Sequence, residues 1–374
     1  MASVLTAQAL ETPTWDALRE LAGLDDKALC LSLYLDLNPH TAAMAEIGAH
    51  ANALLDEAKR QAEAKGEHQE DIDSLLAHAK AYIEEVDLRG LQALALFVQS
   101  QTTRALWLPD PVPDYARIGR GAVVAPIVPV LEHTQDALVV IVGREQGRIL
   151  RARRGRVEEI ESLLEPIRGQ HDQGGWSQTR FRRSIENDYH NHLKHLAEDI
   201  DGETRHEPRP IVMAGAEEGK NDFEHRLGDA SRRLLVGWIH VDPHAPSSAI
   251  ITAAEPLLEA WQATRETELV ARWREAVGRD SAGTRGWGDT LAAAFQGRVS
   301  WLFYAPETHY SAWCCPLCPW AQAVEGQCPV DGGELAQENG LDRVIHQTLH
   351  YGGKVWALRH GDYAPDEIGA LLRF

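Results

Sequence analysis

Alternating helical and strand patterns of hydrophobic positions run through the first third of the chain. Amphipathic spacing predicts a helix at 15–24 and a long helical region at 41–86, interrupted near Lys65-Gly66. Apolar runs between turn residues predict strands at 29–37, 91–100 and 103–110. The proline-rich stretch that follows is typical of a linker, so we expect a first domain boundary near Val128.

The middle of the chain opens with two tandem apolar runs, which predict a strand pair, and continues with a segment that fits either an acidic helix or a strand. A polar loop then precedes a helix over 179–199. Two more apolar runs enclose a helical pattern. The strand pair lies at 136–143 and 147–155, the ambiguous segment at 157–164 and the loop at 165–177. The two later apolar runs lie at 210–215 and 236–242, and the helical pattern between them at 221–235.

The last third repeats the alternation of helices and strands around a cysteine-rich insertion. Helices are predicted at 251–277, 286–297 and 338–353, and strands at 298–305, 354–360 and 368–374. Strands that alternate with helices indicate an α/β fold class. We therefore predict three α/β domains, at 1–128, 129–245 and 246–374, with the cysteine-rich insertion at about 312–333.

Composition and charge narrow the function classes. The 374 residues are 44% hydrophobic and 25% charged, which is ordinary for a globular protein. The net charge of −19 argues against a general nucleic-acid binder, yet residues 144–194 hold 11 Lys or Arg against 8 Asp or Glu. One basic surface could therefore meet RNA. No apolar run or leader pattern predicts a membrane span or a signal peptide, so we expect a cytoplasmic protein without a membrane partner.

The most informative stretch is the loop and helix start GGWSQTRFRR. Gly174 and Gly175 allow the backbone to approach another molecule closely, and Ser177 is a plausible N-cap. The helix dipole disfavours cations in a first turn, so the arginines there suggest a polyanionic partner, although surface arginines often serve only solubility. The first-turn arginines are Arg180, Arg182 and Arg183.

This stretch resembles the catalytic loop of the archaeo-eukaryotic class-I peptide release factors, in which Gly-Gly-Gln precedes a helix. Trp176 stands where that Gln would be, and Gln178 follows two places on. A displaced Gln is similar to the VMS-like peptidyl-tRNA hydrolases of ribosome quality control and their bacterial relatives. The segment GWGDTLAAAFQGRVSWLFYA and the end IGALLRF resemble the C-terminal release-factor domain. The resemblance implies a three-domain architecture with a mixed α/β N-terminal domain, an RNase H-like middle domain and an α/β C-terminal domain with a zinc-knuckle insertion.

The activity implied by this resemblance is hydrolysis of the ester between a nascent peptide and tRNA. Gln178 would position water, because its amide cannot titrate but offers both a donor and an acceptor. Gly174 and Gly175 would give the loop reach. Gln173, placed before the glycines, is a weaker candidate. The implied partners are the large ribosomal subunit, its RNA and peptidyl-tRNA, without DNA or an organic cofactor. The first segment lacks stop-codon elements, so release on stalled ribosomes fits better than codon-dependent termination.

Two other readings stay open. One is a non-catalytic stress or hibernation factor that occupies the tRNA site of the ribosome. The other, for the motif alone, is a glycine-rich surface turn, since short motifs recur by chance. In the basic strand pair upstream, Arg151 and Arg153 could bind RNA phosphates or could lie on a solvated hairpin face. The remaining candidates, His190, His192 and His195, fit a solvated helix face better than a metal site.

Four of the five cysteines cluster near the C-terminus. In a reducing compartment this clustering is typical of metal ligation. We predict a structural Zn²⁺ site whose three thiolates and one carboxylate satisfy a tetrahedron, from Cys315, Cys318, Cys328 and Asp331. Cys314 or His309 could replace the Asp, and a knuckle that keeps its fold without metal is the alternative. Cys30 is expected in the core.

Overall fold

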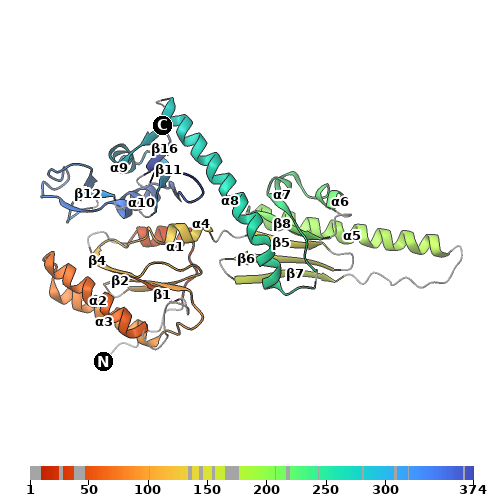
Figure 1. Ribbon diagram of the computed structural model, residues 1–374, viewed down its shortest axis with the longest axis horizontal. Helices are drawn as coiled ribbons and strands as arrows, with labels where there is room; N and C mark the ends of the chain where they lie inside the picture. The colour runs from red at the N-terminus through yellow and green to blue at the C-terminus, as the bar shows by residue number, and fades with distance from the viewer. Residues whose placement is uncertain are drawn as a thin grey trace. The chain divides into compact units, whose positions relative to one another are not determined.

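The computed structural model (Figure 1) divides the chain into two compact units, Met1–Glu132 with Glu266–Phe374, and His133–Arg265. The three-domain division stays a prediction. The structure describes residues 10–24, 28–37, 47–100, 102–133, 137–142, 146–153, 156–164, 177–206, 208–215, 220–242, 244–279, 282–306, 310–318, 320–364 and 367–374. None of its described helices is long and apolar enough to cross a membrane.

The N-terminal part of the first unit is a four-stranded antiparallel sheet in the order β3-β2-β1-β4. Alternate residues of its central strand face two different cores, because successive side chains of a strand point to opposite sides. Leu31 and Leu33 pack with two helices on one face, whereas Cys30 and Tyr34 belong to the core on the other. The elements are α1 (Trp15–Ala22), β1 (Leu29–Asp36), α2 (Ile47–Ala64), α3 (Gln69–Glu85), β2 (Ala93–Gln99), β3 (Thr102–Leu108), β4 (Tyr115–Arg120) and α4 (Ile127–His133).

The predicted linker before Val128 is wrong in part, because it contains β4 and the first residues of α4. The hydrophobic pattern hides β4, since only Ile118 of its six residues is buried. Pairing decides its conformation: β4 lies antiparallel to the buried strand β1 and fills the sheet edge. An edge strand with a solvated face carries little apolar signal of its own.

The C-terminal part of the first unit has a mixed sheet in the order β10-β16-β11-β15 and a small three-stranded sheet in the order β13-β12-β14. The chain's last strand pairs with β10 and β11, which explains its apolar sequence. The elements are α8 (Ser247–Gly278), β10 (Gly283–Arg285), α9 (Trp287–Phe295), β11 (Val299–Tyr304), β12 (Ser311–Cys314), β13 (Ala321–Gln322), β14 (Ala336–Asn339), α10 (Leu341–His350), β15 (Lys354–Ala357) and β16 (Ile368–Leu372).

The two ends of the chain form one unit because they share a hydrophobic core and buried polar contacts. That core includes Tyr34 and Val124 from the N-terminal part and Ile345 from the C-terminal part. Asp342 Oδ1 accepts hydrogen bonds from the N–H groups of Val124 and Ala125, at 2.8 and 2.9 Å. A buried carboxylate that accepts two backbone bonds both satisfies those donors and fixes the contact.

The second unit is built on a five-stranded sheet in the order β7-β6-β5-β8-β9. Three antiparallel strands are followed by two strands parallel to β5, as expected of the predicted RNase H-like domain. One face packs against α5 and the other against the first part of α8 (Figure 1). The elements are β5 (Ala137–Val142), β6 (Gln146–Arg153), β7 (Arg156–Leu164), α5 (Ser177–His206), β8 (Ile211–Gly215), α6 (Lys220–Glu224), α7 (Asp229–Arg233) and β9 (Leu235–Ile239).

Candidate functional site

The motif-bearing helix α5 begins at Ser177, two residues earlier than predicted, and continues to His206. Gln178 therefore lies in its first turn, and Arg180, Arg182 and Arg183 lie in its first two turns. Gly174 and Gly175 lie outside the described residues, as do Gln173 and the side chains of Gln178 and these arginines. Their proposed roles stay predictions.

The second half of α5 is anchored firmly to the rest of its unit. Leu193, Leu196 and Ile200 are fully buried against the sheet. Near the end of the helix, the Asp201 carboxylate accepts hydrogen bonds from the N–H of Gly228 at 3.0 Å and from the hydroxyl of Ser231. Through these contacts α7 and the sheet hold the helix that carries the motif.

One of the arginines upstream of the Gly-Gly loop, Arg148, is buried and holds two elements together. Arg148 on β6 is only 8% exposed. Its guanidinium contacts Glu159 on β7 at 2.9 Å and donates to the carbonyl of Ala245 at 3.1 Å and the hydroxyl of Ser247 at 3.0 Å. Arg148 thus ties the hairpin to the start of α8, and neither reading of the basic strand pair, RNA contact or solvated face, applies to it.

The two arginines predicted to bind RNA lie further along the same strand. Arg151 is half-buried on β6, opposite Glu158 of β7 in the strand register. Arg153 also lies on β6, and its side chain is outside the described residues. Their RNA contact stays a prediction.

The histidines of α5 do not share one environment. The expectation of a solvated face is wrong for His192, which is fully buried. Its ring lies so close to Gly147 that a Cβ there would stand 3.1 Å from His192 Cε1. His190 and His195 are exposed, and His190 Nδ1 accepts from Arg226 at 2.9 Å. The 3.6-residue helical period puts the middle histidine on the side that faces β6.

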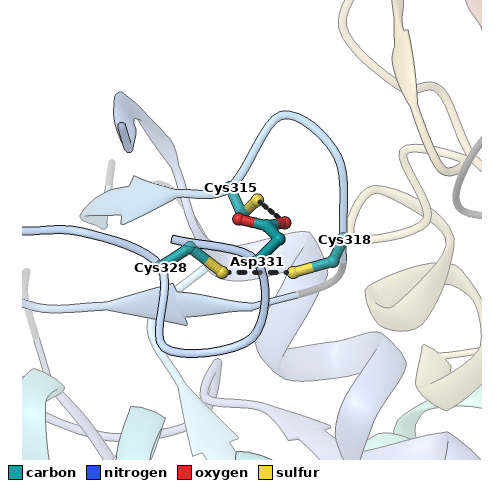
Figure 2. Close-up of side chains that lie close together, drawn as sticks. All are labelled: Cys315, Cys318, Cys328 and Asp331. Carbon is teal, nitrogen blue, oxygen red and sulfur yellow. Dashed lines mark hydrogen bonds between the residues drawn. The ribbon is translucent and has the colours of Figure 1, made fainter. Parts of the chain in front are cut away.

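The cysteine-rich insertion brings four predicted ligands together (Figure 2). Ligand atoms of Cys315, Cys318, Cys328 and Asp331 all lie within 4.8 Å of one another. The two thiols of Cys318 and Cys328 are 3.5 Å apart, and Cys315 Sγ lies 3.1 Å from Asp331 Oδ2. Zn–S bonds of about 2.3 Å in a tetrahedron require sulfurs roughly 3.8 Å apart. The four residues can therefore hold a metal ion.

Two tight turns position these ligands. Cys315 N–H donates to the carbonyl of Trp320, and the N–H of Leu317 points to Cys315 Sγ at 3.3 Å. In the second turn, Gly332 N–H donates back to the carbonyl of Cys328 at 2.8 Å. Gly332 has φ 76°, a left-handed conformation that glycine adopts without strain. Each turn thus presents two ligands, and their side chains meet between the turns.

In the insertion, the pKa values of the thiols and of the carboxylate shift in opposite directions. Burial raises the pKa of Cys315, and burial raises the pKa of Cys318 to about 12. Hydrogen bonds from the Cys315 thiol and from Gly333 N–H lower the pKa of Asp331. Metal-free thiols in this setting stay protonated, so a bound cation would have to displace their protons, as metals bound by cysteine do.

Neither of the two alternative fourth ligands, Cys314 and His309, is found in the four-residue cluster that the described residues form. Cys314 is buried in the core shared by the two ends of the chain, because it is the β12 residue that points away from the insertion. His309 lies outside the described residues. A contact that sequence reasoning missed holds the insertion to α10: Arg343 donates to the carbonyls of Cys318 at 2.9 Å and Cys315 at 3.1 Å.

Sequence comparisons identify the middle of the chain. Residues 123–259 match the profile of bacterial archaeo-eukaryotic release factor family 10. They are a release-factor-like segment of the archaeo-eukaryotic type. The release-factor-like segment includes the Gly-Gly loop, α5 and the sheet of the second unit. A curated relative, peptide chain release factor subunit 1 of Methanosphaera stadtmanae, is 31% identical over 103 residues, which are 27% of this chain and about a quarter (25%) of that protein.

Solved structures similar to the whole chain share much less sequence. The archaeal translation termination factor aRF1 is 15% identical, with 97% of this chain and 99% of that chain covered, at a TM-score of 0.29. Pelota of Archaeoglobus fulgidus is 14% identical, with coverages of 97% and 93%, at a TM-score of 0.35. An archaeal Pelota in a ribosome-bound structure with ABCE1 is 12% identical, with coverages of 98% and 95%, at a TM-score of 0.42. Scores this low carry no functional argument.

Proposed function

We propose that this protein is a ribosome-associated release factor that hydrolyses peptidyl-tRNA on stalled ribosomes without reading a codon. The observation that carries the proposal is the match of residues 123–259 to a bacterial release-factor family. That stretch includes Gly174, Gly175 and Gln178, the residues to which the resemblance assigns the chemistry. The partners would be the large subunit, its RNA and peptidyl-tRNA.

The chemistry asks little of the protein beyond positioning. Ester hydrolysis needs an oriented water and stabilisation of the developing oxyanion. The Gln178 amide would supply a donor and an acceptor at the start of α5, and one preorganised donor at an acyl-transfer centre contributes about 3 kcal/mol. Arg180, Arg182 and Arg183 would contact RNA phosphates on the approach.

The decisive experiment is single-turnover release of nascent peptide from peptidyl-tRNA on isolated large subunits. We expect wild type to release peptide, Gln178→Ala to lose about a hundredfold in rate, and Gln173→Ala, the change at the weaker candidate, to keep nearly full activity. Co-sedimentation separates binding from chemistry. Tight co-sedimentation of wild type without any release would contradict the hydrolase and favour the non-catalytic factor that occupies the tRNA site.

For the insertion, we infer that Cys315, Cys318, Cys328 and Asp331 hold a structural Zn²⁺. The support is the distance set described above and the preference of zinc for four such ligands. The ion would cross-link two turns and take no part in hydrolysis. We expect one zinc per chain in wild type and in Cys314→Ser, and its loss in Cys318→Ser. Wild type refolded with zinc that retains none would contradict the inference.

A further inference from the structure

A cavity of about 400 Å³ lies in the first unit, and its lining includes neither a residue of the hydrolase motif nor one of the four ligands of the insertion. Three segments that are distant in sequence line it: the end of α1 with Gly23, the end of β4 with the following Gly121, and α10. Its volume is in the range of small-molecule sites, which hold about 300–1,000 Å³. The cavity is thus large enough for a metabolite-sized ligand and too small for a length of RNA.

The lining of this cavity is cationic, although the protein is strongly acidic. Lys and Arg number 37 in the whole chain against 56 Asp and Glu. In the lining the balance is reversed, because three arginines stand with a single carboxylate, beside two histidines: Arg117, Arg120, Arg343, Asp342, His346 and His350.

The salt bridges around the cavity leave a surplus of positive charge. Arg117 contacts Glu338 at 3.3 Å, but the same carboxylate also pairs with Lys65 at 2.8 Å. Arg120 meets Glu67 at the longer distance of 3.6 Å. One carboxylate shared between two cations cannot neutralise both.

The other charged groups do not remove this surplus. Arg343 donates hydrogen bonds to the carbonyls of Cys315 and Cys318. These carbonyls are neutral, so they do not compensate the positive charge of Arg343. Asp342 supplies one negative charge against three guanidinium groups, and its Oδ1 accepts hydrogen bonds from two backbone N–H groups. These contacts also fix α10 at the wall of the cavity, which makes its geometry preorganised.

His346 gives an independent sign that the cavity is built for a polar ligand. Its Nε2 is buried, and no described residue forms a hydrogen bond with it. Gly121 keeps the backbone close to this ring: it has φ 76°, and a Cβ there would stand 3.2 Å from His346 Cε1. Buried polar atoms in native proteins generally find a partner, so an unmatched imidazole nitrogen beside a cavity indicates a ligand group.

We propose that this cavity binds a small phosphorylated ligand, with the phosphate held by Arg117, Arg120 and Arg343 and a second polar group of the ligand held by His346. Guanidinium groups match phosphate oxygens in pairs, and charge-assisted hydrogen bonds of this kind are the strong ones. Because both ends of the chain line the cavity, the ligand would cross-link the first unit. The proposal does not depend on the proposed hydrolase activity.

Calorimetric titration of the full chain at constant ionic strength tests the proposal, with inorganic phosphate, pyrophosphate and ribose 5-phosphate as probes. We expect the phosphate ester to bind more tightly than inorganic phosphate. Arg120→Gln should weaken both at least about tenfold. Arg120→Lys, which keeps the charge but not the fork, should fall in between.

The matched control is Arg89→Gln, which removes one positive charge from a side chain that is 80% exposed and does not line the cavity. His346→Gln is the second cavity variant, and a thermal melt of each variant confirms that it folds. Three outcomes would overturn the proposal: no probe binds to wild type at millimolar concentration, Arg89→Gln weakens binding as much as the cavity variants, or only an RNA oligonucleotide binds.

Discussion

Two groups of arginines in this protein differ in how their positions arise. Those of the β6–β7 hairpin are close together in sequence, and Arg148 proves to be buried and paired with Glu159. Those of the cavity, Arg117, Arg120 and Arg343, come from opposite ends of the chain and converge on one space. A run of like charge in sequence therefore does not define a cationic site, whereas convergence in space does.

The physical reason lies in the geometry of strands and in the cost of burial. Successive side chains of a strand point to opposite faces, so a basic run is divided between them. A residue on the inner face must then find a partner or stay out of the core, since an unpaired buried charge is very costly. The hairpin has such a partner in Glu159, and the cavity keeps its cations at a solvent-accessible wall.

The largest expected effect is the loss of stability when Arg148 of the β6–β7 hairpin is replaced. Arg148→Met should lower the free energy of unfolding by about 3 kcal/mol, because the buried guanidinium group loses its hydrogen bonds to Glu159, Ala245 and Ser247. Urea unfolding of the full chain measures it. Arg151→Gln on the same strand should change stability by under about 0.5 kcal/mol. Equal effects of the two changes would show that the contacts of Arg148 stabilise the hairpin no more than those of Arg151.

A medium effect is expected where the cavity meets the cysteine-rich insertion. Arg343→Lys keeps a positive charge at the cavity but loses the fork that reaches the carbonyls of Cys315 and Cys318. We expect a loss of about 1–2 kcal/mol in thermal or urea unfolding. Lys354→Arg, an exposed cation in the same unit, is the control for the exchange itself. Unchanged stability of Arg343→Lys would show that these two hydrogen bonds do not hold the insertion.

A smaller effect should separate RNA contact from ligand contact. If the outer hairpin arginines meet ribosomal RNA, the double change Arg151→Gln/Arg153→Gln should weaken association with the large subunit and reduce its salt slope by about two. Arg120→Gln should leave that slope unchanged. Co-sedimentation at several salt concentrations gives both values. A reduced slope for Arg120→Gln would place the cavity on the RNA surface instead.

The smallest expected effect is a pH dependence at the cavity. Burial lowers the pKa of His346 below its ordinary 6.5. The negative charge of Asp342 on the same helix raises this pKa, whereas the positive charges of Arg343 and of Arg117 on β4 lower it further. Below pH 6.5 the unfolded chain therefore binds a proton that the folded chain does not, and stability falls as pH decreases through this window.

His346→Gln removes that proton-binding difference. Its free energy of unfolding should decline less than that of wild type between pH 7 and pH 5.5, when both are followed by urea unfolding. Parallel declines in the two proteins would show that other groups are responsible.

Much of the fold is predictable from the sequence, and the exceptions depend on contacts between distant segments. The helical periods of α1 and α10 and the apolar run of β5 are visible in the sequence because the apolar residues of each are buried on one side or throughout. The edge strand β4 has a single buried residue, so its sequence predicts a linker rather than a strand. The sequence pattern predicts a solvated face for His192 because its contact with Gly147 joins two distant segments and leaves no local signal.

The sequence alone determined the features that depend on local spacing. Cys315 and Cys318 in one turn and Cys328 and Asp331 in another are brought to ligand distance by turns of a few residues, and the Gly-Gly loop before α5 carries its resemblance within ten residues. Only the tertiary structure decided which charges are paired and which converge. Packing between the two ends of the chain brings Asp342 to Val124 and Arg343 beside Arg117. No local sequence pattern indicates these neighbours.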